Sequence, residues 1–153
     1  MNDKTLVLVR HGEKMITGEP DPTLSFSGKQ QAFALDWKTD VVFVSPLRRA
    51  LQTYTESHIQ TSNVCVRSCF RERMDGISTY FIEEKRPSQR ESEEAFCKRV
   101  TKAVQHLRQY SGKHLTVISH EDFLYMLQVK LEVVAPKKLA TGEALTLILK
   151  PST

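Results

Sequence analysis

Short apolar runs that alternate with helical patterns are the feature of this sequence that most constrains its fold. Valine-rich or otherwise apolar runs occur at residues 5–9, 41–44, 64–66, 115–118 and 144–149. Most of the stretches between them carry apolar residues at helical spacing. This alternation predicts an α/β fold, in which a mostly parallel central sheet lies between helices as a three-layer α/β/α sandwich.

Two helices carry enough signal to predict their bounds. The better defined one runs from about Glu93 to Tyr110 and has Ser92 as its N-cap. The other is predicted to start at an N-cap, Ser25, and to continue to about Lys38. Its core-facing residues are expected to be Ala32, Phe33, Leu35 and Trp37.

Length and cysteine content predict a single domain, residues 1–153, with a core that needs neither metal nor disulfide. The three cysteines match no zinc or redox spacing, so reduced thiols are expected. The N-terminus lacks the pattern of a signal peptide, and no apolar run has the length of a membrane span. These features predict a cytoplasmic protein without a membrane partner.

The formal net charge of +4 and the pI of about 9.0 suit an anionic partner. Basic residues are scattered, and no strand carries the aromatic residues that stack on bases, which argues against nucleic acid. A small phosphorylated substrate or a phosphoprotein is expected instead. The basic segment 85–90 is interpreted as a solvated connector rather than as part of the site.

Chemistry-bearing side chains follow three of the predicted strands. Arg10 and His11 end the first strand, Arg49 comes shortly after the second, and His120 ends a later one. Because ligands gather at the carboxyl ends of parallel strands, these four residues are expected to meet. Two guanidinium groups can grip a phosphate while one imidazole attacks phosphorus, a chemistry that requires no metal or other cofactor. Ser45 is interpreted as the cap of the helix after the second strand.

Several motifs in order resemble those of the histidine phosphatase superfamily, also called the phosphoglycerate mutase-like superfamily. They are Arg10-His-Gly-Glu13, Leu24-Ser-Phe-Ser-Gly-Lys-Gln-Gln-Ala32, Ser45-Pro-Leu-Arg-Arg-Ala-Leu-Gln-Thr53, the segment Glu91–Val100 and Val117-Ile-Ser-His120. The resemblance covers most of the chain and implies a phosphoglycerate mutase-like sandwich.

The resemblance also implies roles for individual residues. His11 would be the nucleophile that becomes phosphorylated, and Arg10, Arg49 and His120 would complete the phosphate pocket. The general acid of the family lies on a loop after the third strand, where Glu72 is the candidate and Asp75 the alternative.

Two departures from the family pattern bear on function. Glu121 stands where the family has a small residue and places a carboxylate beside His120. The chain is also short, with no room for a large cap between residues 76 and 91, which favours a phosphatase over a mutase. The expectation is a metal-independent phosphatase that hydrolyses a phosphomonoester through phosphohistidine. The alternatives are a phosphohistidine protein phosphatase, for which Glu72 would be dispensable, and a non-catalytic phosphate- or phosphoprotein-binding module.

Overall fold

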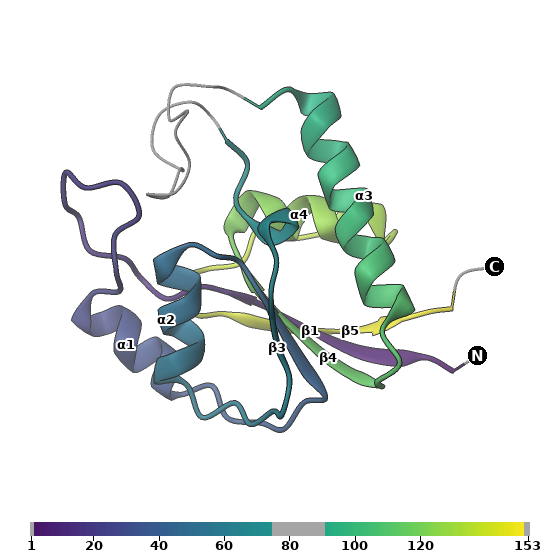
Figure 1. Cartoon of the computed structure of the whole chain (residues 1–153), viewed down its shortest axis with the longest axis horizontal. Coiled ribbons are helices and arrows are strands. Elements are labelled where there is room, and N and C mark those ends of the chain that lie inside the picture. Colours follow the sequence, from purple (N-terminus) through teal and green to yellow (C-terminus); the bar gives the residue numbers. More distant parts are fainter. Residues whose placement is uncertain (1, 75–90, 152–153) are drawn as a thin grey trace.

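The computed structural model describes residues 2–74 and 91–151, and it contains one sheet of five strands in the order β3-β2-β4-β1-β5 (Figure 1). The strands are β1 Lys4–Arg10, β2 Val41–Val44, β3 Val64–Val66, β4 His114–Ser119 and β5 Ala144–Leu149. The pairs β3–β2, β2–β4 and β4–β1 are parallel, and β5 is an antiparallel edge strand on β1. The predicted mostly parallel sheet is therefore confirmed.

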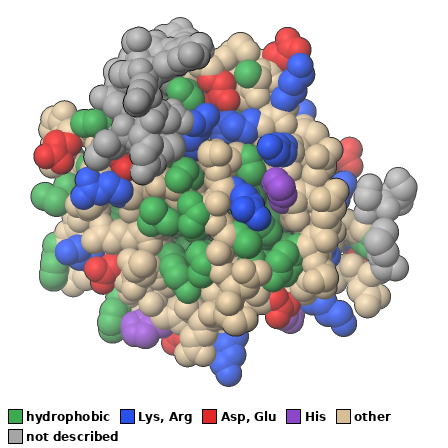
Figure 2. All heavy atoms as spheres, in the orientation of Figure 1, with side chains coloured by type: hydrophobic (Ala, Val, Ile, Leu, Met, Phe, Trp, Pro, Cys, Tyr) green, Lys and Arg blue, Asp and Glu red, His purple; other side chains and the backbone are tan. Residues whose placement is uncertain are grey.

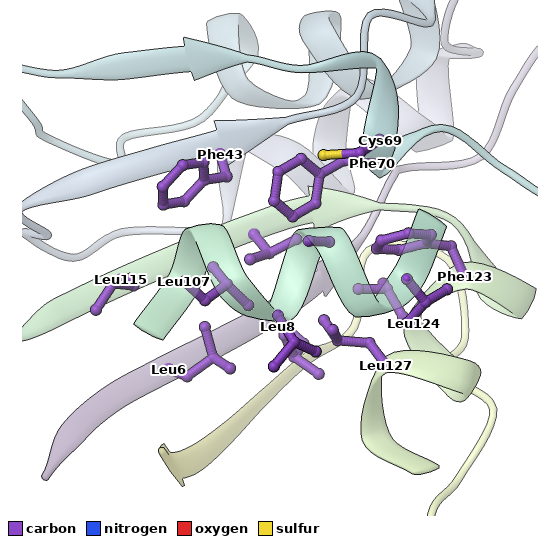
Figure 3. Packing of buried hydrophobic residues seen from close by; sticks show 14 of the residues in the cluster. Leu6, Leu8, Phe43, Cys69, Phe70, Leu107, Leu115, Phe123, Leu124 and Leu127 are labelled. Carbon is purple, nitrogen blue, oxygen red and sulfur yellow. The ribbon is translucent and has the colours of Figure 1, made fainter. Parts of the chain in front are cut away.

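Helices cover both faces of the sheet and complete the predicted three layers (Figure 1). They are α1 Phe26–Phe33, α2 Arg48–Glu56, α3 Glu93–Gln109 and α4 Glu121–Lys130, with a short 3-10 turn, η1, at Ser68–Phe70. Leucine and phenylalanine side chains from α3, α4 and η1 pack on one face of β1, β2 and β4 (Figure 3). Smaller residues such as Val9, Val44 and Ala50 fill the other face beneath α2.

The register of the sheet sets where the strand ends lie. Arg10 pairs with Ser119 across β1 and β4, and Val44 pairs with Ile118 across β2 and β4. The backbone continues this pairing just past the strands, because His11 N donates to Ser119 O at 3.0 Å. The residues after β1, β2 and β4 consequently emerge together at one edge of the sheet.

The prediction for the long helix is confirmed, whereas the prediction for the end of α1 is wrong. Ser92 accepts a hydrogen bond from Ala95 N at the start of α3, as expected of its cap. Helix α1 ends at Phe33 rather than near Lys38. The backbone beyond it pairs with residues 58–60 instead, since Leu35 O accepts from His58 N and Trp37 O accepts from Gln60 N.

This change of partner decides which residues after α1 face the core. Leu35 is buried and Trp37 packs partly against the core, as predicted. Phe33 is 64% exposed, so its expected place in the core is wrong. Its ring meets His58 edge-on at 4.3 Å between ring centroids.

The surface and the thiols add few constraints on function. Figure 2 shows Lys and Arg side chains at several separate places on the face in view. Across residues 2–151 outside the gap at 75–90, no helix has the length and apolarity needed to cross a membrane. All three cysteines are free thiols, as predicted. Asp75, the segment 85–90 and the region predicted to lack a large cap lie outside the described residues.

Candidate active site

His11 lies at the end of β1 with its imidazole held in a defined tautomer. Its Nδ1 is 2.6 Å from Gly12 O, an oxygen that can only accept, so Nδ1 carries the proton. Nε2 then holds the lone pair, and Arg49 Nε donates to it at 3.3 Å. Burial and the neighbouring Arg49 charge lower the pKa of His11 to about 3. At neutral pH the residue therefore presents an uncharged imidazole whose Nε2 lone pair points toward Arg49.

His120 lies beneath His11, at the N-terminus of α4. The two imidazole centroids are 5.1 Å apart, and His120 is 1% exposed. Its Nε2 is 2.8 Å from Ser45 Oγ, while its Nδ1 is buried and lacks a hydrogen-bond partner among the described residues. Burial and the charge of Arg49 hold the pKa of His120 well below the usual range of histidine. The ring is thus neutral, with Nδ1 available for a further hydrogen bond.

A pocket of about 650 Å³ opens at this edge of the sheet. The described residues that line it are Arg10, His11, Glu13, Lys14, Met15, Ile16, Ser25, Arg49, Glu72 and Thr141. It therefore contains four of the five predicted site residues, and the ring of the fifth, His120, packs against the His11 ring. Arg10 Nε and Arg49 Nη1 are buried and make no hydrogen bond within the described part of the chain. Unpaired buried guanidinium donors beside a neutral imidazole are suited to an oxyanion.

Glu72 reaches this pocket from the loop after η1 and is anchored to α4. One carboxylate oxygen accepts from Phe123 N at 2.9 Å, and the other accepts from Asp122 N at 3.2 Å. Burial raises the pKa of Glu72 above the ordinary glutamate value, although these backbone N–H groups oppose the rise. The carboxyl group is therefore fixed in position, and burial stabilises its protonated form relative to that of a glutamate in water.

Arg99 on α3 holds the loop that carries Glu72. Its guanidinium donates to the carbonyl oxygens of Cys69, Arg71 and Glu72 at 2.6–3.1 Å. The same group forms a two-pronged pair with Glu91, both contacts being 2.8 Å. The position of Glu72 relative to the pocket thus depends on a largely buried ion pair between Arg99 and Glu91, two residues that the sequence assigned only to a motif.

Two further polar residues that support the site were not identified as such from the sequence. Asp21 is buried, and its Oδ1 accepts from Arg48 N at the start of α2, the helix that carries Arg49. Thr53 Oγ1 accepts from Gly12 N at 2.9 Å and so ties the loop after β1 to α2. Thr53 belongs to the motif that follows β2, but Asp21 lies in a loop with no pattern that would single it out.

The interpretation of Ser45 as a helix cap is wrong. The N-cap of α2 is Leu47, two residues later, and it has no side-chain cap. Ser45 Oγ accepts from Leu47 N at 3.2 Å, and its remaining contact is the one with His120. Since β2 and β4 are adjacent, the hydroxyl at the end of β2 meets the imidazole at the end of β4 and helps to fix its orientation.

The side-chain partner of Glu121 is Arg10. The sequence predicted a carboxylate beside His120, and the structure pairs Glu121 Oε2 with Arg10 Nη1 at 3.0 Å.

The described residues contain no candidate metal site. No group of three or more His, Cys, Asp or Glu side chains among residues 2–74 and 91–151 is arranged to hold an ion.

Comparison with known proteins identifies the class to which this fold and site belong. The sequence model of the histidine phosphatase superfamily (branch 1) matches residues 6–144. The chain therefore belongs to the histidine phosphatase superfamily, and the predicted enzyme class, a phosphatase of this type, is confirmed. No curated protein matches the sequence.

Solved structures support the fold. Alpha-ribazole phosphatase from Shigella flexneri is similar with a TM-score of 0.73 and 20% identity, over 93% of this chain and 89% of that one. The mycobacterial glucosyl-3-phosphoglycerate phosphatase is similar with a TM-score of 0.63 and 19% identity, over 96% of this chain and 91% of that one. Phosphoserine phosphatase from Entamoeba histolytica is similar with a TM-score of 0.64 and 20% identity, over 94% of this chain and 89% of that one. The phosphoglycerate mutase-like sandwich predicted from the sequence is confirmed.

Proposed function

We propose that this protein is a metal-independent phosphatase that hydrolyses a phosphomonoester through a phosphohistidine intermediate on His11. The observation that carries the proposal is the state of the His11 ring. Gly12 O fixes the proton on Nδ1, and burial beside Arg49 keeps the ring neutral, so Nε2 is a nucleophile in a pocket lined by two arginines.

The proposed first step is an in-line attack of His11 Nε2 on phosphorus. The bond from phosphorus to the ester oxygen breaks, and Glu72 supplies the proton that the leaving alkoxide takes. Arg10 and Arg49 stabilise the charge on the transferring phosphoryl oxygens, and His120 donates a hydrogen bond from Nδ1. Water then attacks phosphohistidine and loses a proton to Glu72, which releases inorganic phosphate and restores both residues.

Hydrolysis of p-nitrophenyl phosphate in excess EDTA tests this proposal. The wild-type protein is expected to turn over, and His11→Ala is expected to lose at least about 10³-fold in kcat. His58→Ala is the matched control, because His58 is exposed, contacts Phe33 at the end of α1 and is not among the described residues that line the pocket. Turnover that requires metal, or that persists in His11→Ala, would refute the mechanism.

One observation favours a second candidate, a phosphohistidine protein phosphatase. Both oxygens of Glu72 accept backbone hydrogen bonds, so the carboxyl group already has a structural role at the start of α4. An imidazole leaving group needs less protonation than an alkoxide does, and such an enzyme could use Glu72 only to position α4. The third alternative, a non-catalytic binding module, has no comparable support, because binding alone does not require a neutral nucleophilic imidazole.

A further inference from the structure

Glu121 and the carbonyl of Leu139 together occupy one end of the Arg10 guanidinium. Nη1 of Arg10 donates to Glu121 Oε2 and to Leu139 O, each at 3.0 Å. A guanidinium Nη has two hydrogens, so both hydrogens of Nη1 are used. The edge formed by Nε and Nη2 remains for a ligand, and Nε is buried without a partner among the described residues.

The ion pair between Arg10 and Glu121 also lowers the net positive charge of the pocket. Three basic and two acidic side chains are among the described residues that line the pocket. Glu121 adds a third carboxylate, directly on one of the two arginines that face the phosphate site. Arg10 and Glu121 are both partly buried, with side-chain exposures of 23% and 37%, so solvent screens this charge incompletely.

The entrance of the pocket is not built for a second anion. Besides the two arginines, Lys14 is the basic residue among the described residues that line the pocket, and its chain neighbour Glu13 contributes a carboxylate to the same lining. Met15 and Ile16 also line the pocket, and the side chain of Ile16 is fully exposed. An organic group that projects from a bound phosphate would therefore meet apolar atoms and compensated charges.

From these contacts we infer that Glu121 determines substrate specificity. By pairing with Arg10 it limits the positive charge of the pocket to what one phosphoryl group requires. The pocket then selects monophosphates whose organic part is uncharged, and it disfavours those with a carboxylate or second phosphate near the reacting phosphoryl group. The inference rests on the proposed phosphatase function and specifies the substrate class of that same site.

A matched pair of substrates tests the inference. 3-Carbamoylphenyl phosphate and 3-carboxyphenyl phosphate have nearly the same shape and differ by one negative charge. The wild-type enzyme is expected to have the higher kcat/KM for the carbamoyl compound. Glu121→Gln keeps a hydrogen-bond acceptor for Arg10 but removes the charge, and it should reduce this preference about fivefold.

Asp122→Asn is the control, because it removes one charge from the same turn of α4 without a contact to Arg10. Asp122 instead lies 3.9 Å from Lys138. The control should leave the preference within about twofold of the wild type. An unchanged preference in Glu121→Gln, or an equal change in Asp122→Asn, would overturn the inference.

Calorimetric binding of inorganic phosphate gives a readout that needs no turnover. Glu121→Gln should bind phosphate about fivefold more tightly than the wild type, because the carboxylate no longer repels the anion. Unchanged affinity would overturn the inference even if no ester were hydrolysed. Failure of the proposed phosphatase mechanism would give a different result, namely turnover that persists in His11→Ala.

Discussion

At the scale of single residues, Glu72 is subject to two opposing influences. Burial favours its neutral form, as a general acid requires, and the result is a raised pKa. The backbone N–H groups of Arg73, Asp122 and Phe123 favour its carboxylate form and hold it in place. Which influence matters for catalysis depends on how much protonation the leaving group needs.

Glu72→Gln separates the two proposed enzymes. The amide oxygen still accepts a backbone hydrogen bond, but the side chain no longer supplies an acidic proton. If the substrate is a phosphomonoester, kcat for phenyl phosphate should fall about 10²-fold or more. If it is a phosphohistidine, turnover of a phosphohistidine peptide should stay within about threefold of the wild type. Glu13→Gln, at another carboxylate that lines the pocket, controls for loss of charge.

At the scale of elements, close backbone packing fixes the loop after β1 against α1. A side chain at Gly28 would place its Cβ 2.0 Å from Glu13 O, and one at Gly12 would lie 2.5 Å from Gly28 O. Backbone atoms cannot move away as a flexible side chain can. The two glycines therefore allow the segment with His11, Glu13 and Lys14 to approach the helix closely enough to form one wall of the pocket.

Gly28→Ala should damage stability and activity together. The added methyl group must displace the Glu13 backbone or the start of α1, which we expect to cost about 1–3 kcal/mol of unfolding free energy. The kcat/KM should fall because the displaced loop lines the pocket. Urea unfolding and steady-state kinetics measure both effects, with the exposed neighbour Ser27→Ala as control. Wild-type stability in Gly28→Ala would contradict the packing argument.

At the scale of the whole molecule, the site makes stability depend on pH. The folded protein holds His11 and His120 neutral in its interior, and both pKa values lie below the ordinary histidine value of 6.5. In the unfolded chain these residues take up protons as the pH falls below about 6.5. Because the unfolded state then binds more protons than the folded state, acidification favours unfolding.

The amount of stability that His11 is expected to contribute follows from its pKa of about 3 in the folded protein. The contribution is fully present above the unfolded pKa and is lost progressively as the pH falls toward the folded pKa. At pH 5 this one residue should account for about 2 kcal/mol of lost stability relative to pH 7. Urea unfolding at both pH values should show a smaller loss in His11→Gln. An identical loss in both proteins would mean that His11 titrates alike in the two states.

Motifs in the sequence indicated the class of enzyme through their resemblance to a known family. The sequence by itself also determined the strands and the order in which chemistry-bearing residues leave them. These properties are local: hydrophobic period specifies a strand, and the residue that follows it in the chain must emerge at its carboxyl end. For this reason the sequence predicts that Arg10, His11 and His120 lie at one edge of the sheet. Parallel pairing of the strands then made their meeting a geometric necessity.

Only the tertiary structure decided the contacts between segments that are distant in the chain. The backbone after Phe33 leaves the helix because residues 58–60 offer it hydrogen bonds, and Ser45 contacts His120 because β2 lies beside β4. Glu121 pairs with Arg10, 111 positions earlier in the chain. A side chain's partner is chosen by the free energy of all groups packed around it, and that environment exists only once the chain has folded.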